Sequence, residues 1–313
     1  MLALTATTGK IGGAVLSALL THKLIPANEV VICTSSDPDS ERWTALKAQG
    51  GRVRHANFAD PASMRAAFAG CAKLLLVSSP DITLDFFDAP AGHGREKHHI
   101  AAIEAARAAG VAHIFYTSLA FGAPASAAGV MRAHLRTEAH LRQMKGTAFT
   151  IIREGLYNES WPLYLGYYYD FQGDDRREIV VAGDGPVSWT AVADLGYATA
   201  LVLVDTAGRY EGAAFYLSAP TTRTLADIAQ VVAAAKGYEV KIKEVDRDEY
   251  CRHYVEEKGR DKDAVEWWAS TYEALRKGEC KVRDSTLSNL LVSRGVRLKP
   301  VEETVREMLL AGE

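Results

Sequence analysis

The segment that decides the fold is Leu2-Ala3-Leu4-Thr5-Ala6-Thr7-Thr8-Gly9-Lys10-Ile11-Gly12. It begins as a short apolar strand, passes through a glycine-bearing turn and continues into a helix from Gly13 to Leu20. The N–H groups at the start of such a helix have no partner within it, and their partial positive charge suits a pyrophosphate. The segment therefore predicts a dinucleotide site, with an ordinary strand-to-helix turn as the alternative.

Two of the three glycines of the usual dinucleotide fingerprint are present. Gly9 and Gly12 hold the positions that allow close backbone approach and close helix packing, whereas Ala6 stands where the first glycine is expected. Alanine tolerates every backbone conformation except those with positive φ. We therefore expect its methyl group to narrow the turn without forbidding it.

Composition limits the class of protein. The 313 residues are 48% hydrophobic, enough for one large α/β domain or two of unequal size. The four cysteines are far apart, which predicts neither a disulfide framework nor a zinc site. A net charge of −3 with interspersed signs gives no footprint for nucleic acid, and no apolar segment is long enough to span a membrane. We expect a soluble, cytoplasmic protein.

Apolar runs of strand length alternate with helical patterns in the first half, as in βαβ units. Right-handed crossovers then give a doubly wound parallel sheet, the Rossmann arrangement, with the ligand at the carboxyl ends of the strands. The expected strands after the first are Glu29–Thr34, Arg52–Ala56, Lys73–Ser78, His113–Thr117 and Ala148–Arg153. The expected helices are Ser40–Gln49, Pro61–Phe68, Glu96–Ala109 and Met131–Met144.

The second half has a different character, and we expect a dinucleotide-binding domain over 1–155 and a smaller α/β substrate domain over 156–313. Residues around 190–205 are expected to pack back on the first domain. The predicted elements are a strand at Ala214–Ser218 and helices at Val192–Val204, Leu225–Lys236, Arg247–Lys258, Ala264–Lys277 and Val301–Leu310. The loop Asp81–Arg95 is either a flap over the cleft or a surface insertion.

Several segments together resemble a known family. They are Thr5–Gly12, Lys73–Ser79, Ala105–Val111, Tyr116–Leu119, the HxxTE pattern at His134–Glu138, Ala182–Gly185, Thr224-Leu225 and Arg276–Glu279. In this order and spacing the chain resembles the NmrA-like atypical short-chain dehydrogenases of the quinone oxidoreductase 2 and triphenylmethane reductase type. That resemblance implies NADPH or NADH bound in a cleft between a Rossmann domain and a small α/β domain.

Carried over by position, the resemblance implies cofactor contacts from four loops. The backbone of Thr7, Thr8, Gly9, Lys10, Ile11 and Gly12 would hold the pyrophosphate. Asn57 and Phe58 would flank the adenine, and Ser78, Ser79 and Pro80 would line the ribose and nicotinamide side. Thr117 and Ser118 would approach the nicotinamide ring.

The loop after the second strand bears on cofactor choice. Many relatives have Arg there to hold the 2′-phosphate of NADP, whereas this chain has Ser35 and Ser36. The acidic residue of an NAD site is also absent. Because two hydroxyls and Arg42 can still bind a phosphate, the sequence favours NADP modestly over NAD.

The usual catalytic pair of short-chain dehydrogenases, Tyr-x-x-x-Lys, is missing at the expected place. The lysine would stand four residues after Tyr116, and that position is Ala120. The one literal match, Tyr254 with Lys258, lies far from the cofactor loops and is interpreted as coincidence. His134 occupies the position of a lysine in related isoflavone and lignan reductases. It is either a proton donor or ribose contact, or a structural histidine at a helix start.

A set of aromatic residues is expected to wall a flat apolar substrate pocket, with core packing as the alternative. The set is Phe121, Tyr157, Trp161, Tyr164, Tyr167, Tyr168, Tyr169 and Trp189. Tyr157 is the preferred contact because it follows the sixth strand, where Glu154 replaces the Asn frequent in the family. The histidines at 93, 98 and 99 lack carboxylate or thiol partners, so we expect them on solvated loop and helix faces rather than in a metal site.

Two functions remain open. The first is an NAD(P)H-dependent reductase that transfers hydride to a planar, quinone-like small molecule, with His134, Ser118 and Tyr157 as catalytic candidates. The second is a redox-sensing regulator that binds dinucleotide without turnover and contacts a protein partner, as the resemblance to NmrA itself implies. A sensor needs different affinities for the oxidised and reduced cofactor.

Overall fold

A parallel sheet forms the centre of the molecule. The structure is a computed structural model that describes residues 1–121, 123, 125–167 and 171–311. Within these ranges, seven strands pair in the order β3-β2-β1-β4-β5-β6-β8, and every pairing is parallel. This confirms the doubly wound Rossmann sheet.

The secondary-structure elements have the following bounds. The strands are β1 Leu2–Thr5, β2 Val30–Thr34, β3 Arg52–His55, β4 Lys73–Leu76, β5 His113–Leu119, β6 Ala148–Glu154, β7 Glu178–Val181, β8 Ala214–Leu217 and β9 Lys241–Glu244. The α-helices are α1 Lys10–Thr21, α2 Thr44–Ala48, α3 Pro61–Phe68, α4 Glu96–Ala108, α5 Met131–Gln143, α6 Trp161–Tyr164, α7 Val192–Leu203, α8 Leu225–Lys236, α9 Arg247–Arg252, α10 Lys262–Arg276, α11 Thr286–Val292 and α12 Val301–Leu310. Short 3₁₀ turns lie at Ala27–Glu29, Glu41–Trp43, Ile82–Asp85 and Asn158–Ser160, and a π-turn at His253–Glu257.

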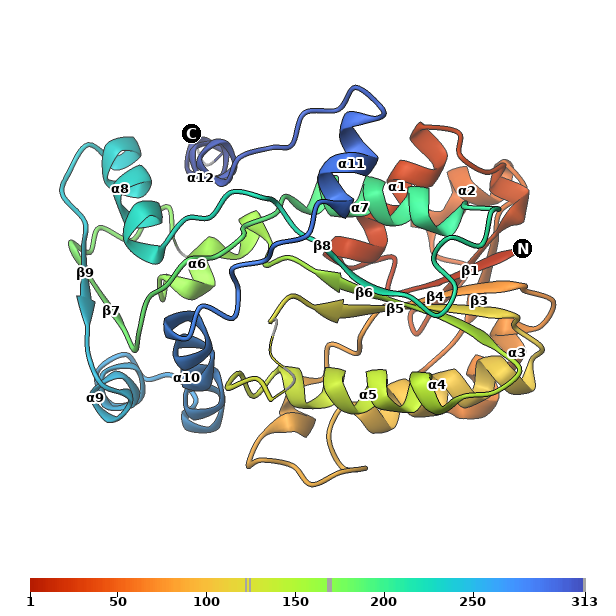
Figure 1. Cartoon of the computed structure of the whole chain (residues 1–313), viewed down its shortest axis with the longest axis horizontal. Coiled ribbons are helices and arrows are strands. Elements are labelled where there is room, and N and C mark those ends of the chain that lie inside the picture. The colour runs from red at the N-terminus through yellow and green to blue at the C-terminus, as the bar shows by residue number, and fades with distance from the viewer. Residues whose placement is uncertain (122, 124, 168–170, 312–313) are drawn as a thin grey trace.

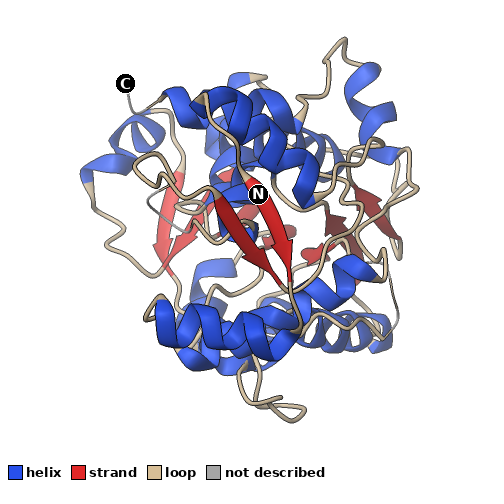
Figure 2. Cartoon of the chain, turned by 90° about the vertical axis from the view of Figure 1, so that its left-hand side faces the viewer, coloured by secondary structure: helices blue, strands red, loops and turns tan. Residues whose placement is uncertain are grey.

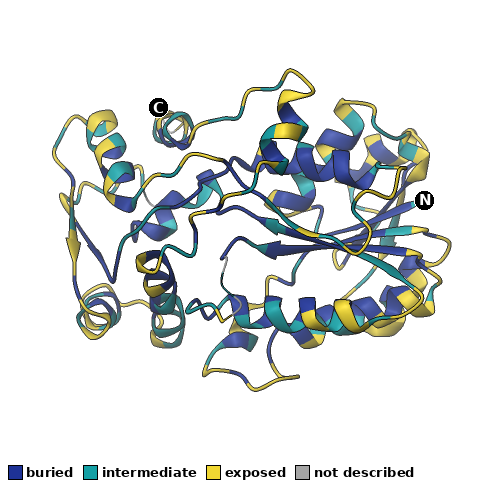
Figure 3. Cartoon of the chain, viewed as in Figure 1, coloured by how far each residue is buried: buried dark blue, intermediate teal, exposed yellow. Residues whose placement is uncertain are grey.

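Helices cover both faces of the sheet (Figure 1). Helices α1, α7 and α11 pack on one face around Val15, Leu75 and Leu195, and α3, α4 and α5 pack on the other around Phe68, Leu74 and Ile103. Because both faces are covered, β1, β2 and β4 consist almost entirely of buried apolar residues (Figure 3). We call the sheet with these helices and α2 the sheet lobe.

A second lobe is built around the two-stranded parallel sheet of β7 and β9. Helices lie above and below these strands (Figure 2). A separate apolar cluster with Trp161, Leu225 and Tyr272 holds together α6, α8, α9, α10 and α12. We call this the C-terminal lobe. It does not coincide with one continuous stretch of chain, because α7, β8 and α11 join the sheet lobe.

The order of strands reverses between β1 and β4, the point at which ligands bind in open α/β sheets. Thr5, at the carboxyl end of β1, joins the two strands. Its hydroxyl donates to the carbonyl of Leu75 at 3.2 Å and accepts from the N–H of Val77 at 2.9 Å. The side chain of Thr5 therefore holds together the two strands that flank the crevice.

Most predicted elements agree with the structure to within a residue or two. The differences are short elements. The predicted helix at Ser40–Gln49 is a 3₁₀ turn followed by α2, and β7, β9, α6 and α11 were not predicted. Within the described ranges, no helix is both long and apolar enough to cross a membrane.

Candidate cofactor-binding and active site

The turn after β1 is built for close approach of a ligand to the backbone. Gly9 is the N-cap of α1, and no side chain caps the helix, so its first N–H groups face the crevice. A Cβ on Gly12 would lie 2.3 Å from the carbonyl oxygen of Ala6 and 2.9 Å from that of Thr5. Only glycine therefore fits at position 12. The buried hydroxyl of Thr7 has no protein partner in the described part of the chain, which leaves it available to a phosphate.

Ala6 differs from expectation. Its φ is +52°, in the left-handed region that alanine avoids, and its carbonyl accepts a hydrogen bond from the N–H of Gly9 at 2.9 Å. The turn thus keeps the conformation that a first glycine would adopt, although the residue is alanine. The turn forms, as expected for a methyl group that narrows it without forbidding it, but Ala6 is held at positive φ, the conformation that alanine avoids.

A hollow of about 170 Å³ lies beside this turn at the carboxyl ends of β1, β2 and β3. Its lining includes six predicted cofactor residues: Thr7, Thr8, Ser35, Asn57, Phe58 and Pro80. The rest of the lining is mainly small or apolar and includes Cys33, Met64 and Phe68. A hollow that combines apolar side chains with a few polar groups fits an adenosine, so the residues present suit a dinucleotide.

Two of the predicted phosphate contacts do not line this hollow. Ser36 is exposed, and its N–H donates to the hydroxyl of Thr34 at 3.2 Å. Arg42 places its guanidinium over the ring of Trp43, 5.3 Å from the ring centre. Ser35 is the polar residue of the β2 loop that faces the hollow.

The loop after β4 is held by its backbone. The N–H of Ser78 donates to the hydroxyl of Thr117 at 3.1 Å, and that of Ser79 donates to Nε2 of His99 at 2.9 Å. Both predicted residues, Ser79 and Thr117, are therefore buried at the carboxyl edge, beside the turn after β1.

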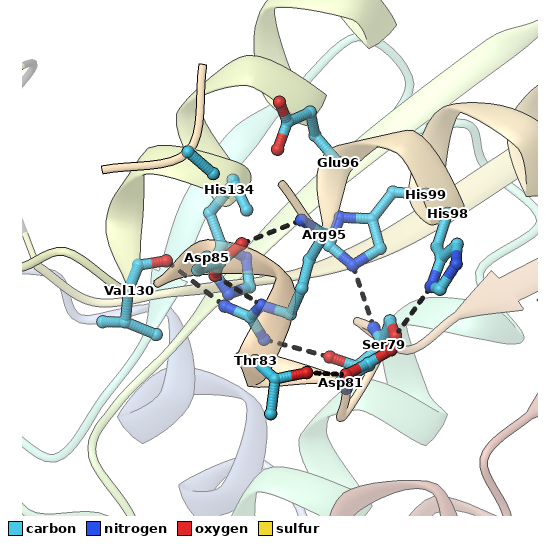
Figure 4. Close-up of polar contacts among 12 residues, drawn as sticks. Ser79, Asp81, Thr83, Asp85, Arg95, Glu96, His98, His99, Val130 and His134 are labelled. Carbon is cyan, nitrogen blue, oxygen red and sulfur yellow. Dashed lines mark hydrogen bonds and ion pairs between the residues drawn. The ribbon is translucent and has the colours of Figure 1, made fainter. Parts of the chain in front are cut away.

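A buried ion pair fixes the segment from 81 to 95, predicted to be a flap or a surface insertion. Nε of Arg95 donates to Asp85 at 2.7 Å, and the backbone N–H of Arg95 donates to the other carboxylate oxygen at 2.8 Å. The same guanidinium donates to the carbonyls of Ser79 and Val130 (Figure 4). With Arg95 and Asp85 both almost fully buried, the base of this loop is tied to the active-site edge.

His99 is locked in one tautomer by its neighbours. Because its Nε2 accepts from Ser79, its proton is on Nδ1, which lies 2.9 Å from the hydroxyl of Thr137. Thr137 in turn donates to the carbonyl of Ala133. Burial, aided by the charge of Arg95, lowers the pKa of His99 to about 3, so the ring is neutral.

The same accounting fixes His134. The hydroxyl of Tyr116 lies 2.9 Å from Nδ1 of His134 and 3.2 Å from the protonated Nδ1 of His99, so it donates to His134. The proton of His134 is then on Nε2. Burial and Arg95 lower the pKa of His134 well below its ordinary value, and burial raises that of Tyr116. His134 is therefore a neutral ring that accepts the Tyr116 hydrogen bond at Nδ1, rather than an acid.

The hydroxyl of Ser118 is committed within the protein. It donates to Oε1 of the buried Glu138 at 2.7 Å, and Arg153 and Arg142 bind the same carboxylate. Although burial opposes it, hydrogen bonds from Arg153 and Ser118 hold the pKa of Glu138 below its usual range. Ser118 therefore anchors α5 to β5 and β6.

Glu154 and Tyr157 form a pair at the carboxyl end of β6. The hydroxyl of Tyr157 lies 2.7 Å from Oε2 of Glu154, whereas Oε1 is buried and has no partner among the described residues. Burial raises the pKa of Glu154 to about 8. Tyr157 is partly exposed and packs against the same apolar cluster as Ala6 of the cofactor turn. The pair therefore lies on the sheet face that carries this turn.

Core packing accounts for most of the aromatic set. Phe121, Trp161, Tyr164, Tyr167 and Trp189 are almost fully buried in the apolar cluster of the C-terminal lobe. The expected aromatic wall thus reduces to Tyr157, since Tyr168 and Tyr169 lie outside the described residues. Tyr254 also belongs to this cluster, and its hydroxyl donates to the carbonyl of Val180 at 3.0 Å.

Sequence reasoning missed the group of His99 with Asp85 and Arg95. It singled out Glu154 as a departure from the family but did not predict the burial of its carboxyl. The histidines at 93, 98 and 99 were expected on solvated loop and helix faces, and this was wrong for His99, which is fully buried. In the ranges that the structure describes, no group of three or more His, Cys, Asp or Glu side chains is placed to hold a metal ion.

Comparison with known proteins agrees with this geometry. An NAD(P)H-binding family model matches residues 7–195. Quinone oxidoreductase 2 of Escherichia coli is 32% identical over 244 residues, 77% of this chain and 76% of that protein. An NmrA-like family domain-containing oxidoreductase, flvB of Aspergillus flavus, is 28% identical over 98% of this chain and 94% of its own length.

Solved structures agree over the whole chain. The E. coli NADPH-dependent quinone oxidoreductase complexed with NADPH superposes with a TM-score of 0.79 at 28% identity, covering 98% of this chain and 99% of that one. The Citrobacter triphenylmethane reductase complexed with NADP(H) gives 0.79 at 30% identity with the same coverage. The chain therefore belongs to the NAD(P)H-binding, NmrA-like family of oxidoreductases.

Proposed function

We propose that this protein is an NADPH-dependent reductase of planar, conjugated small molecules such as quinones. The observation that carries the proposal is the turn at Ala6–Gly12, which retains the tight conformation of a dinucleotide loop despite an unfavourable residue at position 6. Strain of this kind persists where the surrounding structure enforces it, and it is common at ligand sites. Relatives that reduce quinones and triphenylmethane dyes support the reaction class.

Each cofactor group has residues suited to it. The uncapped start of α1 would hold the pyrophosphate, and Asn57 and Phe58 would flank the adenine. Ser35 would meet the 2′-phosphate of NADPH. Ser78, Ser79 and Thr117 would border the ribose and nicotinamide. When bound, the reduced nicotinamide supplies the hydride, and the protein supplies orientation.

The catalytic candidates take different roles. Tyr157 is a half-buried residue at the carboxyl edge, with its hydroxyl 2.7 Å from Glu154, and is proposed to contact the substrate. His134 lies behind Tyr116 and is proposed to position it through the Tyr116–Nδ1 hydrogen bond. Ser118 is proposed to position α5 through Glu138 rather than to contact the substrate.

Mixing the purified protein with NADPH and a panel of quinones and cationic triphenylmethane dyes tests the proposal. We expect loss of the reduced-nicotinamide absorbance with at least one acceptor class, and faster loss with NADPH than with NADH. Gly12→Ala is the control, since its Cβ would collide with the carbonyl of Ala6. Cofactor binding without turnover across the panel would reject the reductase.

Measurements on the same purified protein distinguish the reductase from the redox-sensing regulator. A sensor would bind NADP⁺ and NADPH with clearly different affinities and would not consume NADPH. Calorimetric titration of both cofactor forms, alongside the turnover assay, separates the two functions.

A further inference from the structure

Glu154 and Tyr157 lie at the carboxyl edge of the sheet, the edge at which parallel α/β sheets bind their ligands. Glu154 is the last residue of β6 and is opposite Leu119, the last residue of β5. Tyr157 pairs through a β-bridge with Thr190, just before α7. The pair thus lies at the carboxyl edge of the sheet. It is at the end of β6, which neighbours β5, the strand that holds Thr117.

The position of the proton on Glu154 follows from hydrogen-bond accounting. A neutral carboxyl has one O–H, which is on Oε1 or Oε2. On Oε1 it would be a buried donor without a partner, at a cost of about 1–3 kcal/mol. On Oε2 it replaces the Tyr157 O–H as the donor in the 2.7 Å hydrogen bond and leaves Oε1 as a buried carbonyl oxygen without a partner among the described residues. The second arrangement frees the O–H of the partly exposed Tyr157.

Few charged groups act on the pair. Burial raises the pKa of Glu154, and the hydrogen bond with Tyr157 opposes that shift. Burial raises the pKa of Tyr157 well above its usual range, with further contributions from Glu154 and Glu159. Glu159 caps α7 through the N–H of Val192, and Asp194 of α7 interacts electrostatically with Glu159. No cationic group contributes to either shift within the described chain.

We propose that Glu154 and Tyr157 form a proton relay in which the Tyr157 hydroxyl protonates the oxygen of a carbonyl substrate and the buried Glu154 carboxyl reprotonates Tyr157. This inference rests on the proposed reductase function and names the acid in it. Tyr157 is the catalytic residue, because it contacts the substrate. Glu154 is a positioning and proton-supplying residue that acts through Tyr157.

The step balances for a quinone. Quinone, one hydride and one proton give hydroquinone, so the quinone is reduced by two electrons and NADPH is oxidised to NADP⁺. The O–H bond of Tyr157 breaks as a new O–H bond forms on the substrate. The O–H bond of Glu154 breaks as that of Tyr157 is restored, and the Glu154 carboxylate recovers its proton from water.

A cationic triphenylmethane dye provides the matched comparison. Its central carbocation accepts a hydride and becomes a neutral product directly, so no proton enters the reaction. The two acceptors therefore share hydride transfer and differ in the need for an acid. The ratio of quinone to dye turnover isolates the proton step from cofactor binding and folding.

The experiment measures kcat for one quinone and one cationic dye with NADPH in the wild type, Glu154→Gln and Tyr157→Phe. Glu211→Gln and Tyr210→Phe are matched controls, since both residues line a hollow with Lys73 and His113 at the amino ends of β4 and β5. General acids contribute about a hundredfold or more to rate, so we expect each site variant to lower the quinone-to-dye ratio at least about tenfold. The controls should leave the ratio as in the wild type.

Two further readouts do not depend on a single rate. Quinone turnover by the wild type should fall above about pH 8, where Glu154 ionises and its carboxylate holds the Tyr157 proton, while dye turnover should not follow this fall. Infrared spectra of the cofactor-free protein at neutral pH should contain a protonated-carboxyl band that Glu154→Gln removes.

The outcomes separate the two proposals. A quinone-to-dye ratio within about twofold of the wild type in both site variants overturns the relay and leaves the reductase standing. A wild type that reduces dye but not quinone also overturns the relay. If neither acceptor is reduced, the proposed function fails, and the infrared band then reports only that the carboxyl is neutral.

Discussion

Replacing Glu154 with Gln should make the free energy of unfolding less dependent on pH. In the folded chain burial raises the pKa of Glu154 from an ordinary value of 4.5 to about 8. Between these values the folded protein keeps the proton and the unfolded chain releases it, so the free energy of unfolding falls as pH rises. Gln cannot ionise, and its amide retains both a donor and an acceptor for Tyr157.

The size of the effect follows from the pH interval. Each pH unit inside the window changes the free energy of unfolding by about 1.4 kcal/mol per proton. From about pH 5.5 to about pH 7.5, the Glu154→Gln protein should therefore gain roughly 3 kcal/mol relative to the wild type. Below about pH 4.5 the group is protonated in both states and the difference should level off.

Urea unfolding followed by tryptophan fluorescence measures this difference. Both proteins are unfolded at each pH, and the contributions of other titrating groups cancel because the two proteins share them. A constant difference between Glu154→Gln and wild type over this range would refute the reasoning, because it would mean that Glu154 is already ionised in the folded protein.

Three more predictions concern the cofactor edge. Ser35→Arg should strengthen NADPH binding by about 1 kcal/mol or more and leave NADH binding unchanged. Calorimetric titration with both cofactors measures this. Equal gains in affinity for the two cofactors would place the side chain away from the 2′-phosphate. Ala6→Gly should raise the urea midpoint, because glycine removes about 1 kcal/mol of left-handed strain, and a lower midpoint would contradict that strain. Arg95→Met should lower the free energy of unfolding by roughly 3–5 kcal/mol, since it leaves the Asp85 carboxylate buried without its cation. A loss under about 1 kcal/mol would show that water reaches this carboxylate.

The sheet was predictable because its strands are buried on both faces. Val30–Thr34 and Lys73–Leu76 are nearly continuous apolar runs, and such runs need no knowledge of their partners. The strand Lys241–Glu244 has three charged residues of four and exists only because it pairs with β7. A contact that is entirely tertiary leaves no local signal.

The site was predictable where the course of the backbone alone determines which residues come together. Residues of the turn and of the loops after β2 and β3 fall together because parallel strands end at one edge. Side-chain environments were not predictable in this way. Trp161 and Trp189 looked like a substrate wall, but an aromatic residue in the sequence does not reveal whether its ring faces a core or a cleft. Glu154 is buried at the end of β6 and hydrogen-bonded to Tyr157, and neither property leaves a local signal in the sequence.

The interleaving of the two lobes constrains how they can move relative to each other. After β6 the chain leaves the sheet lobe, returns for α7 and β8, leaves again, returns for α11 and leaves once more for α12. Its connections run at 155–160, 182–191, 218–224, 277–285 and 293–300. Helix α7 is also held against α1, since a Cβ on Gly196 would come within 2.5 Å of the side chain of Ala14.

Domain rotation about a hinge concentrates the backbone change in a few residues. Here such a rotation would have to bend several connections at once and separate α7 from α1. The lobes are mechanically coupled in parallel, so the stiffness of each connection adds to that of the others. We therefore expect substrates to enter through local movement of the loops at the carboxyl edge, with rates set by those loops rather than by domain motion.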